Sequence, residues 1–227
     1  MDLVEVGSKI SLFFIPFLFA ICFHEWAHAL VARLKGDPTA EMMGRLTLNP
    51  LPHIDPLGTV VFPMLAILSG GFFFFGWAKP VPVSVRNLKQ PSKDMFWIAI
   101  AGPLSNLFLA VVAAFLLGAN ARFNPFPDYA DATMKILQFF IIINLSLMVF
   151  NFIPIHPLDG GKILARFLPA SANEWLENNS STLGVALLAL IVLDGLTGRG
   201  STVIGTPVRF LYENLVGAAG YFFAFVI

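Results

Sequence analysis

The sequence predicts an all-α multi-pass membrane protein, and two observations carry this prediction. The chain of 227 residues is 57% hydrophobic, with a mean hydropathy of +0.77 and only 12% charged residues. Soluble domains carry about twice that charged fraction. Several apolar stretches are also long enough to cross a bilayer as helices, which takes about 20 residues each. We therefore expect one domain, residues 1–227, built as a helical bundle in the membrane.

The charge balance gives no sign of a nucleic-acid partner. Lysine and arginine together number 14, and so do aspartate and glutamate. Binding to nucleic acid usually needs a basic excess on one face. Cys22 is the only cysteine, so no disulfide can form within the chain.

Six apolar stretches suggest a bundle of about five to six membrane segments. In chain order they are residues 8–33, 57–78, 94–119, 135–153, 183–197 and 208–227. The first ends at a water interface, where Arg33, Lys35 and Asp37 follow. The third carries the sequence Ala-Gly-Pro-Leu-Ser-Asn at 101–106. Its small residues would let another helix backbone approach closely, and its Asn106 would need a specific partner.

Two connections have the composition of short membrane-associated β segments. The connection 37–56 contains four prolines, and a strand is plausible around residues 45–48. Residues 78–86 combine two prolines with three valines, which favours extended backbone. We expect the second strand over residues 81–85.

The sequence His24-Glu25-Trp26-Ala27-His28 lies inside the first apolar stretch. On a helix, the two histidines are one turn apart on the same face, so they can hold one zinc ion. Glu25 borders the pair without having to be a ligand, which suits a general base acting on a zinc-activated water. The H-E-x-x-H pattern also arises by chance. Inside an apolar span, however, these polar side chains are costly without partners, which favours the metal interpretation.

A catalytic zinc usually has three protein ligands, so a third must come from elsewhere. The candidates are His53, His156, Asp159 and Asp194. Asp159 is the best of these, because it follows a proline-broken helix end beside the membrane. It could instead cap the helix that begins at Gly160. His156 could be the ligand, a hydrogen-bonding neighbour of one, or a loop residue, and His53 is equally well explained as a loop histidine.

Three motifs, in this order, resemble the site-2 protease family of intramembrane zinc metalloproteases. HEWAH starts at His24, AGPLSN occupies 101–106, and NFIPIHPLDGG occupies 151–161. The last motif fits the family pattern N-x-x-P-x-x-x-L-D-G. The resemblance covers roughly residues 20–168 and is far more specific than any one motif.

The resemblance implies one zinc ion per chain, held by His24, His28 and Asp159. It implies Glu25 as the catalytic base and places Asn106 near the substrate. The expected activity is zinc-dependent cleavage of peptide bonds in or next to transmembrane segments of membrane-protein substrates, known as regulated intramembrane proteolysis. The expected setting is the cell membrane, with the active site towards the cytoplasm.

By its resemblance the chain looks like a minimal member of the family, without a PDZ-like or nucleotide-sensing domain. Two other functions stay open at this point. One is a non-proteolytic metal-binding membrane protein or carrier. Glu25 is evidence against a carrier, because a carrier does not need a base that is not a metal ligand. The other is a zinc hydrolase acting on lipids or small molecules.

The proposed ligand set also constrains the topology. Both histidines lie near the C-terminal end of the first stretch, and Asp159 follows the C-terminal end of the fourth. These two stretches must therefore run in the same direction for the ligands to meet. Since the third stretch already crosses once between them, we expect residues 57–78 to enter and return on the same side. The bend should lie near Pro63 or at Gly70-Gly71.

Overall fold

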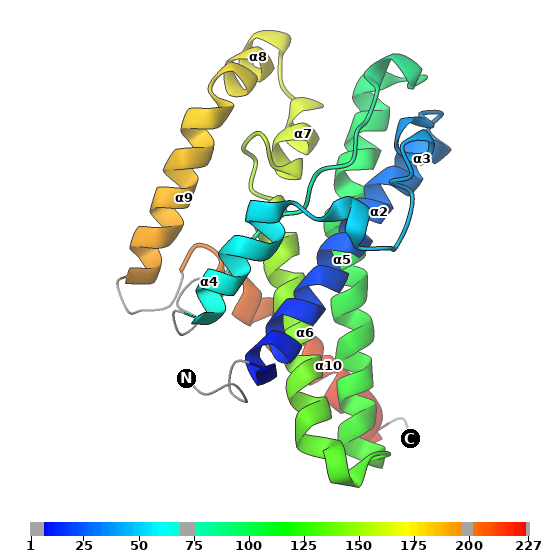
Figure 1. Ribbon diagram of the computed structural model, residues 1–227, viewed down its shortest axis with the longest axis vertical. Helices are drawn as coiled ribbons and strands as arrows, with labels where there is room; N and C mark the ends of the chain where they lie inside the picture. Colours follow the sequence, from blue (N-terminus) through cyan, green and yellow to red (C-terminus); the bar gives the residue numbers. More distant parts are fainter. Residues whose placement is uncertain (1–6, 69–75, 197–201, 226–227) are drawn as a thin grey trace.

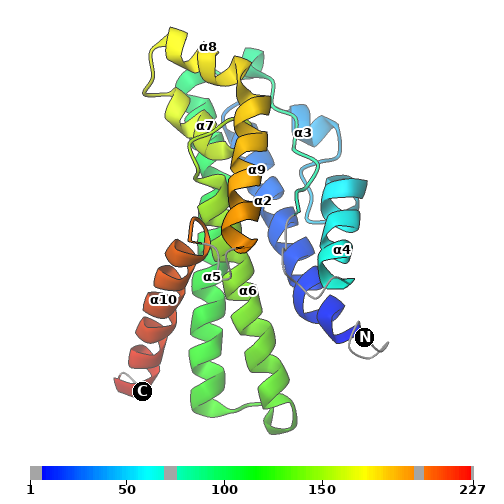
Figure 2. The ribbon, with the colours of Figure 1, turned by 90° about the vertical axis from the view of Figure 1, so that its left-hand side faces the viewer.

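The structure is a computed structural model that describes residues 7–68, 76–196 and 202–225 (Figure 1). Three long helices form its centre: α2 (Ile15–Leu34), α5 (Pro91–Phe123) and α6 (Ala130–Asn151). Helices α2 and α6 run in the same direction and α5 runs against them (Figures 1 and 2). This is the arrangement that the ligand set required.

Six further helices among the described residues surround this centre. They are α3 (Thr39–Met42), α4 (Phe62–Leu68), α7 (Asp159–Ala165), α8 (Ala170–Asn178), α9 (Ser180–Leu196) and α10 (Gly205–Phe225). A π-helical turn precedes α2 at Ile10–Phe14, and another precedes α4 at Pro56–Val61. Single 3-10 turns lie at Leu51–His53, Val85–Asn87 and Pro127–Tyr129.

The expected count of five to six membrane segments is not confirmed. Among the described residues, three helices are long and apolar enough to cross a membrane: Gly7–Leu34, Pro91–Phe123 and Pro127–Asn151. A fourth crossing results if α8 and α9, bent by 65° relative to each other, count as one broken span. Helix α10 is long enough to cross a membrane but is not apolar enough, since Arg209 and Glu213 lower its mean hydropathy.

The expected β segments are not confirmed either, because the described residues contain no strand. Residues 46–48 form bends and residue 45 has no regular structure. Residues 76–84, which we call the strap, also have no regular secondary structure. The backbone of the strap is held by isolated hydrogen bonds, not by the hydrogen-bond ladder of a β-sheet. The N–H of Lys79 donates to the carbonyl of His53 (2.9 Å), and the carbonyl of Lys79 accepts from the Arg45 side chain (2.6 Å). The prolines of the strap, which lack an N–H, explain why valine-rich composition alone did not give a strand.

Small side chains on α5 let α6 and α10 pack closely against it. The buried cluster between α5 and α6 includes Ala110, Ala113, Ala114, Ile141 and Leu145. At Gly118 a Cβ atom would lie 2.7 Å from the ring of Phe223 on α10. Close packing through small residues is the usual basis of helix association in lipid, where burying apolar surface gives little driving force.

The segment 57–78 returns to the level at which it begins. The N–H of Trp77 donates to the carbonyl of Gly58 (3.1 Å), and the Thr59 hydroxyl donates to the carbonyl of Trp77 (2.8 Å). Its two ends are therefore in contact, as a re-entrant segment requires. No reversal occurs at Pro63, which lies in the first turn of α4. The other expected bend, Gly70-Gly71, lies outside the described residues.

A buried carboxylate fastens the far end of the strap to the end of α2. Asp37 is fully buried just beyond that helix. It accepts hydrogen bonds from the N–H of Ser84 (2.7 Å), the side chain of Asn87 (2.8 Å) and the N–H of Thr39 (3.1 Å). Burial alone would raise the pKa of Asp37, but hydrogen bonds from Thr39, Asn87 and Ser84 lower it.

The re-entrant topology predicts that residues on either side of 57–78 face the same side of the membrane. Single cysteines at Met43 and Lys89, both exposed, should be labelled by a membrane-impermeant thiol reagent from the same side, in a Cys22→Ala background. A cysteine at the exposed Asp128 should label from the opposite side, because α5 crosses once in between. Labelling of the first two positions from opposite sides would show that the segment crosses outright.

The Asp37 contacts predict a pH-dependent contribution to stability. Asp37→Ala should lower the melting temperature in detergent, since each buried donor left without an acceptor costs about 1–3 kcal/mol. The folded-state pKa lies below the unfolded one, so this stabilisation is present above the unfolded pKa and is lost as the pH falls through the folded pKa. The difference in melting temperature between wild type and Asp37→Ala should therefore become smaller at acidic pH. The control Glu41→Ala, at an exposed site, should have little effect on the melting temperature at any pH. A difference in melting temperature that stays constant into the acid range would contradict this account.

Candidate metal centre

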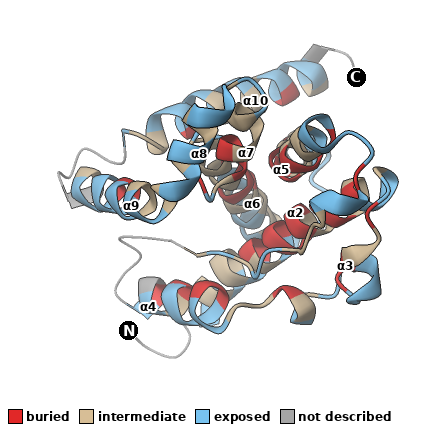
Figure 3. Ribbon diagram, turned by 90° about the horizontal axis from the view of Figure 1, so that it is seen from above, coloured by how far each residue is buried: buried red, intermediate tan, exposed pale blue. Residues whose placement is uncertain are grey.

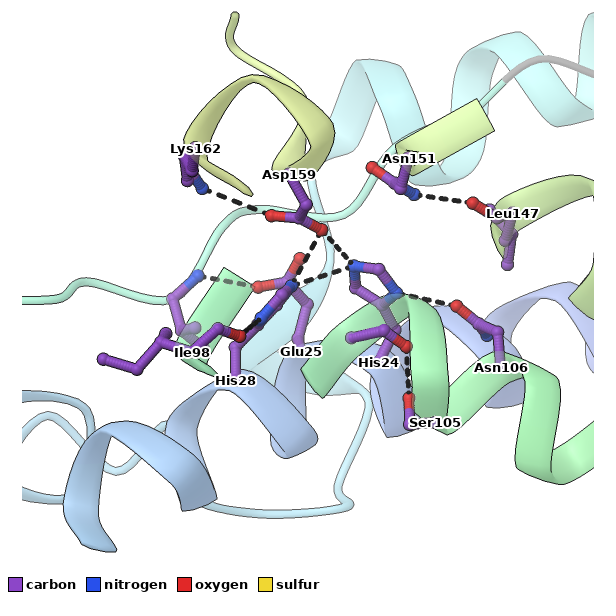
Figure 4. Close-up of polar contacts among 12 residues, drawn as sticks. His24, Glu25, His28, Ile98, Ser105, Asn106, Leu147, Asn151, Asp159 and Lys162 are labelled. Carbon is purple, nitrogen blue, oxygen red and sulfur yellow. Dashed lines mark hydrogen bonds and ion pairs between the residues drawn. The ribbon is translucent and has the colours of Figure 1, made fainter. Parts of the chain in front are cut away.

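Three side chains from two helices meet at one point inside the bundle (Figure 4). The Nε2 atoms of His24 and His28 are 3.0 Å apart, and each lies 3.1 Å from Oδ2 of Asp159. All three residues are buried. They are the group that could hold a metal ion within the described part of the chain. The structure thus brings together the three residues that the family resemblance implied as ligands.

In each imidazole, the hydrogen bond made by Nδ1 determines whether Nε2 can act as a metal ligand. Nδ1 of His24 donates to Oδ1 of Asn106 (2.7 Å), and Nδ1 of His28 donates to the backbone carbonyl of Ile98 (2.7 Å). Both acceptors are oxygens, so both Nδ1 atoms carry a proton, and each imidazole in its neutral form then presents a lone pair at Nε2. Two lone pairs and a carboxylate oxygen at this spacing repel one another unless a cation lies between them.

This donor set fits zinc. Zinc takes imidazole nitrogen and carboxylate oxygen ligands at about 2.0–2.2 Å, a distance that three atoms 3.0–3.1 Å apart can all satisfy. The partners of the two Nδ1 atoms fix ring orientation in the way common at zinc sites.

A carboxylate must be ionised to serve as a metal ligand. The other oxygen of Asp159, Oδ1, lies 3.4 Å from the amino group of Lys162. Oδ2 is thereby left to face the histidines.

Helix α5 approaches the two histidines at a glycine. A Cβ atom on Gly102 would lie 2.4 Å from Nε2 of His28 and 2.6 Å from Nε2 of His24. No side chain fits there, so the glycine of the Ala-Gly-Pro sequence is a requirement of the site. The following Pro103 lies inside α5 and removes one helical N–H, which loosens the backbone at this level.

Asp159 reaches the histidines because α7 begins against a tight turn. A Cβ on Gly160 would lie 2.3 Å from the carbonyl oxygen of Ile153, and one on Gly161 would lie 2.6 Å from the backbone nitrogen of His156. Two glycines therefore let the first turn of α7 pack directly on the chain that leaves α6. The alternative role for Asp159 is not observed, because the start of α7 has no side-chain cap.

Glu25 stands beside the three ligands without joining them. Its Oε2 accepts the N–H of Val81 in the strap at 2.7 Å. This bond ties the strap to α2 and fixes the carboxylate next to the metal centre.

A cavity of about 600 Å³ opens on this centre. Its wall is mainly apolar and comes from α2, the strap, α5, the end of α6, the 155–162 turn and α9. The polar groups that line it include His24, Glu25, Asn151, His156 and Lys162. Seen from above, the buried residues of α2, α5 and α6 face one another at the middle of the bundle (Figure 3).

The remaining candidate ligands lie elsewhere. His53 is buried in its loop and donates from Nε2 to the carbonyl of Thr47 (2.9 Å). Asp194 accepts from the hydroxyl of Thr202 (2.8 Å) after α9. His156 lines the cavity but is not part of the three-ligand cluster.

Several residues that shape the centre were not foreseen from the sequence. Ile98 acts through its backbone carbonyl, and Val81 through its backbone N–H, so neither has a side-chain signal. Asn144 is fully buried on α6 and bonds to Asn106. Its only signal was an asparagine inside an apolar stretch, which calls for a partner in a membrane helix.

Comparison with known proteins agrees with this geometry. The description "Peptidase family M50" matches residues 12–193. YwhC of Bacillus subtilis (strain 168), which its name classes with the zinc metalloproteases, is 39% identical over 193 residues, covering 84% of this chain and 82% of that protein. Rip2 of Mycolicibacterium smegmatis, classed likewise, is 35% identical over 163 residues, covering 70% of this chain and 59% of that protein.

Rip2 of Mycobacterium tuberculosis is 30% identical over 181 residues, covering 80% of this chain and 66% of that protein. No solved structure matches the chain at a significant level. The family match covers most of the sequence and includes all three converging ligands. The chain therefore belongs to peptidase family M50, the site-2 protease family of zinc metalloproteases.

Proposed function

We propose that the chain is an intramembrane endopeptidase that cleaves membrane proteins in or next to their transmembrane segments, as in regulated intramembrane proteolysis. The observation that carries this proposal is the position of Glu25. It is an unliganded carboxylate beside a three-ligand centre, on the wall of an apolar cavity enclosed by membrane helices. A base, a metal centre and an apolar substrate space are the parts that hydrolysis inside a membrane needs.

His24 and His28 would hold one zinc ion per chain through Nε2, and Asp159 would complete the set through Oδ2. Bound there, zinc supplies Lewis acidity, polarising a substrate carbonyl and making water a better nucleophile near neutral pH. Asn106 and Ile98 keep the two imidazoles turned towards the centre. Lys162 holds the second oxygen of Asp159 away from it.

Glu25 would act as the general base. Among the described contacts only its Oε2 is engaged, by the N–H of Val81, so Oε1 is left to accept a proton from the attacking water. The same oxygen would then pass the proton to the leaving amine. The strap fixes the carboxylate in this orientation, so little reorganisation is needed.

The substrate must present an extended backbone, because a helix keeps its carbonyls in internal hydrogen bonds. The strap lines the cavity and is not part of a sheet, so an unwound substrate segment could lie alongside it. Pro80 and Pro82 have no N–H, so the strap would offer a substrate mostly carbonyl acceptors there. This supports a substrate that pairs by donating its own N–H groups.

Asn106 remains a predicted substrate contact. Its side chain is fully buried and is not among the groups that line the cavity. Asn151 does line the cavity, with one of its amide hydrogens bonded to the carbonyl of Leu147 (3.0 Å). Asn151 is therefore the better candidate for touching a bound peptide.

The setting we propose is the cell membrane, with the active site towards the cytoplasm. The alternative functions are a metal carrier or other non-proteolytic metal-binding protein, and a hydrolase of lipids or small molecules. A carrier has no use for a base that a backbone N–H holds beside the ligands. Activity on protein substrates is what separates the proposal from a lipid hydrolase.

Replacing the base should separate metal binding from chemistry. Glu25→Gln keeps the shape of the side chain but removes the proton acceptor, so it should retain zinc and lose cleavage by about 100-fold or more. The assay is mass spectrometry of products after incubating purified protein with a panel of single-span membrane proteins. Glu213→Gln, at an exposed site on α10, serves as the matched control and should cleave normally. Full activity in Glu25→Gln would show that Glu25 is not the base.

A further inference from the structure

A buried row of amide groups leads from α6 through α5 to the first metal ligand. The side chain of Asn144 donates from Nδ2 to the carbonyl of Phe140 (2.9 Å). Its Oδ1 accepts from Nδ2 of Asn106 (2.9 Å), whose Oδ1 in turn accepts from Nδ1 of His24 (2.7 Å). Both asparagines are 0% exposed.

The direction of every hydrogen bond in this row is set at its far end. A backbone carbonyl can only accept, so Phe140 forces Asn144 to present its amino group there and its oxygen to Asn106. Asn106 must then turn its amino group towards Asn144. The carbonyl of Ala20 reinforces this orientation by accepting from the same amino group (3.3 Å). The oxygen of Asn106 is left facing His24, and only a protonated Nδ1 can complete the bond.

We infer that Asn144 and Asn106 are positioning residues that hold His24 with its proton on Nδ1 and its Nε2 lone pair turned to the metal centre. The inference rests on the proposed role of His24 as a zinc ligand. It gives the histidines two different supports, both from α5. His28 is held directly by a backbone carbonyl, whereas His24 depends on a side chain that needs its own anchor on α6.

This role explains why two amides lie in the apolar interior at all. Burying an amide without partners is costly, and three of the four amide hydrogens of this pair have described acceptors. Neither residue is among those that line the cavity, so a positioning role accounts for them better than a contact with substrate. Asn120 offers a contrast on the same helix α5, since it is 6% exposed and its Oδ1 has no partner among the described residues.

The first test is zinc affinity, measured by competition with a chromogenic chelator in detergent. Asn144→Leu removes the anchor at nearly constant size and should weaken zinc binding by about 10–100-fold, the usual effect of losing a group that orients a metal ligand. Asn144→Asp should stay close to wild type, because a neutral carboxylic acid in this apolar place repeats both hydrogen bonds. Asn120→Leu is the matched control and should bind zinc normally. If Asn144→Leu does not fold, Asn106→Leu tests the same row one step closer to His24 with the same expectation.

The second test measures solvent exchange of the Nδ1–H protons of the two histidines. In zinc-loaded protein labelled with 15N-histidine, the Nδ1–H protons of His24 and His28 should both exchange slowly with solvent. Asn144→Leu should speed exchange at His24 only, since His28 is bonded to Ile98 and provides an internal reference. A general loosening of the fold would speed both.

The outcomes separate this inference from the proposed function. A folded Asn144→Leu with wild-type zinc affinity and slow exchange at His24 overturns the inference alone. So does an Asn106→Leu variant that raises the KM for cleavage while leaving zinc affinity intact, because that pattern indicates substrate contact. If wild type and His24→Ala hold the same zinc, the proposed ligand set itself fails, and the inference fails with it.

Discussion

Three acceptor atoms that repel one another lie within 3.1 Å inside an apolar bundle, and the rest of the fold depends on this arrangement. Two come from α2, and the third comes from α7, more than 130 residues later in the chain. Buried lone pairs and a buried carboxylate are costly unless a cation compensates them. Zinc bound there would provide that compensation, which would explain why a largely apolar chain keeps His24, His28 and Asp159 in its interior.

The main features of the fold follow from bringing these atoms together. Helices α2 and α6 run in parallel so that Asp159 arrives at the level of the histidines, and the antiparallel α5 packs against both. Gly102 lets α5 touch both imidazoles, and the same helix supplies the acceptors that orient them. The re-entrant segment returns the chain to the strap, whose Val81 N–H holds the Glu25 carboxylate. The position of Asp159, the orientation of the two imidazoles and the position of the Glu25 carboxylate thus depend on three different elements, α7, α5 and the strap.

The sequence predicted what depends on local periodicity and motif order. The spacing of His24 and His28 needs only a helix, and the turn chemistry around Asp159 singled it out over His156. What it could not predict depends on tertiary contacts. The valines of the strap favoured a β-strand. Its prolines, and its hydrogen bonds to Arg45 and His53, override that strand preference. Backbone partners such as the Ile98 carbonyl leave no mark on the sequence, and the 65° bend between α8 and α9 is likewise not visible in it.

The most direct test of the account is zinc K-edge X-ray absorption on the purified protein, together with zinc content per chain. The account predicts about one zinc bound by two imidazole nitrogens and a carboxylate oxygen at about 2.0–2.2 Å. His156→Ala should keep this spectrum, and Asp159→Ala should lose most of the metal. The reverse pattern, or a sulfur ligand from Cys22, would contradict the claim that these three converging atoms form the metal centre.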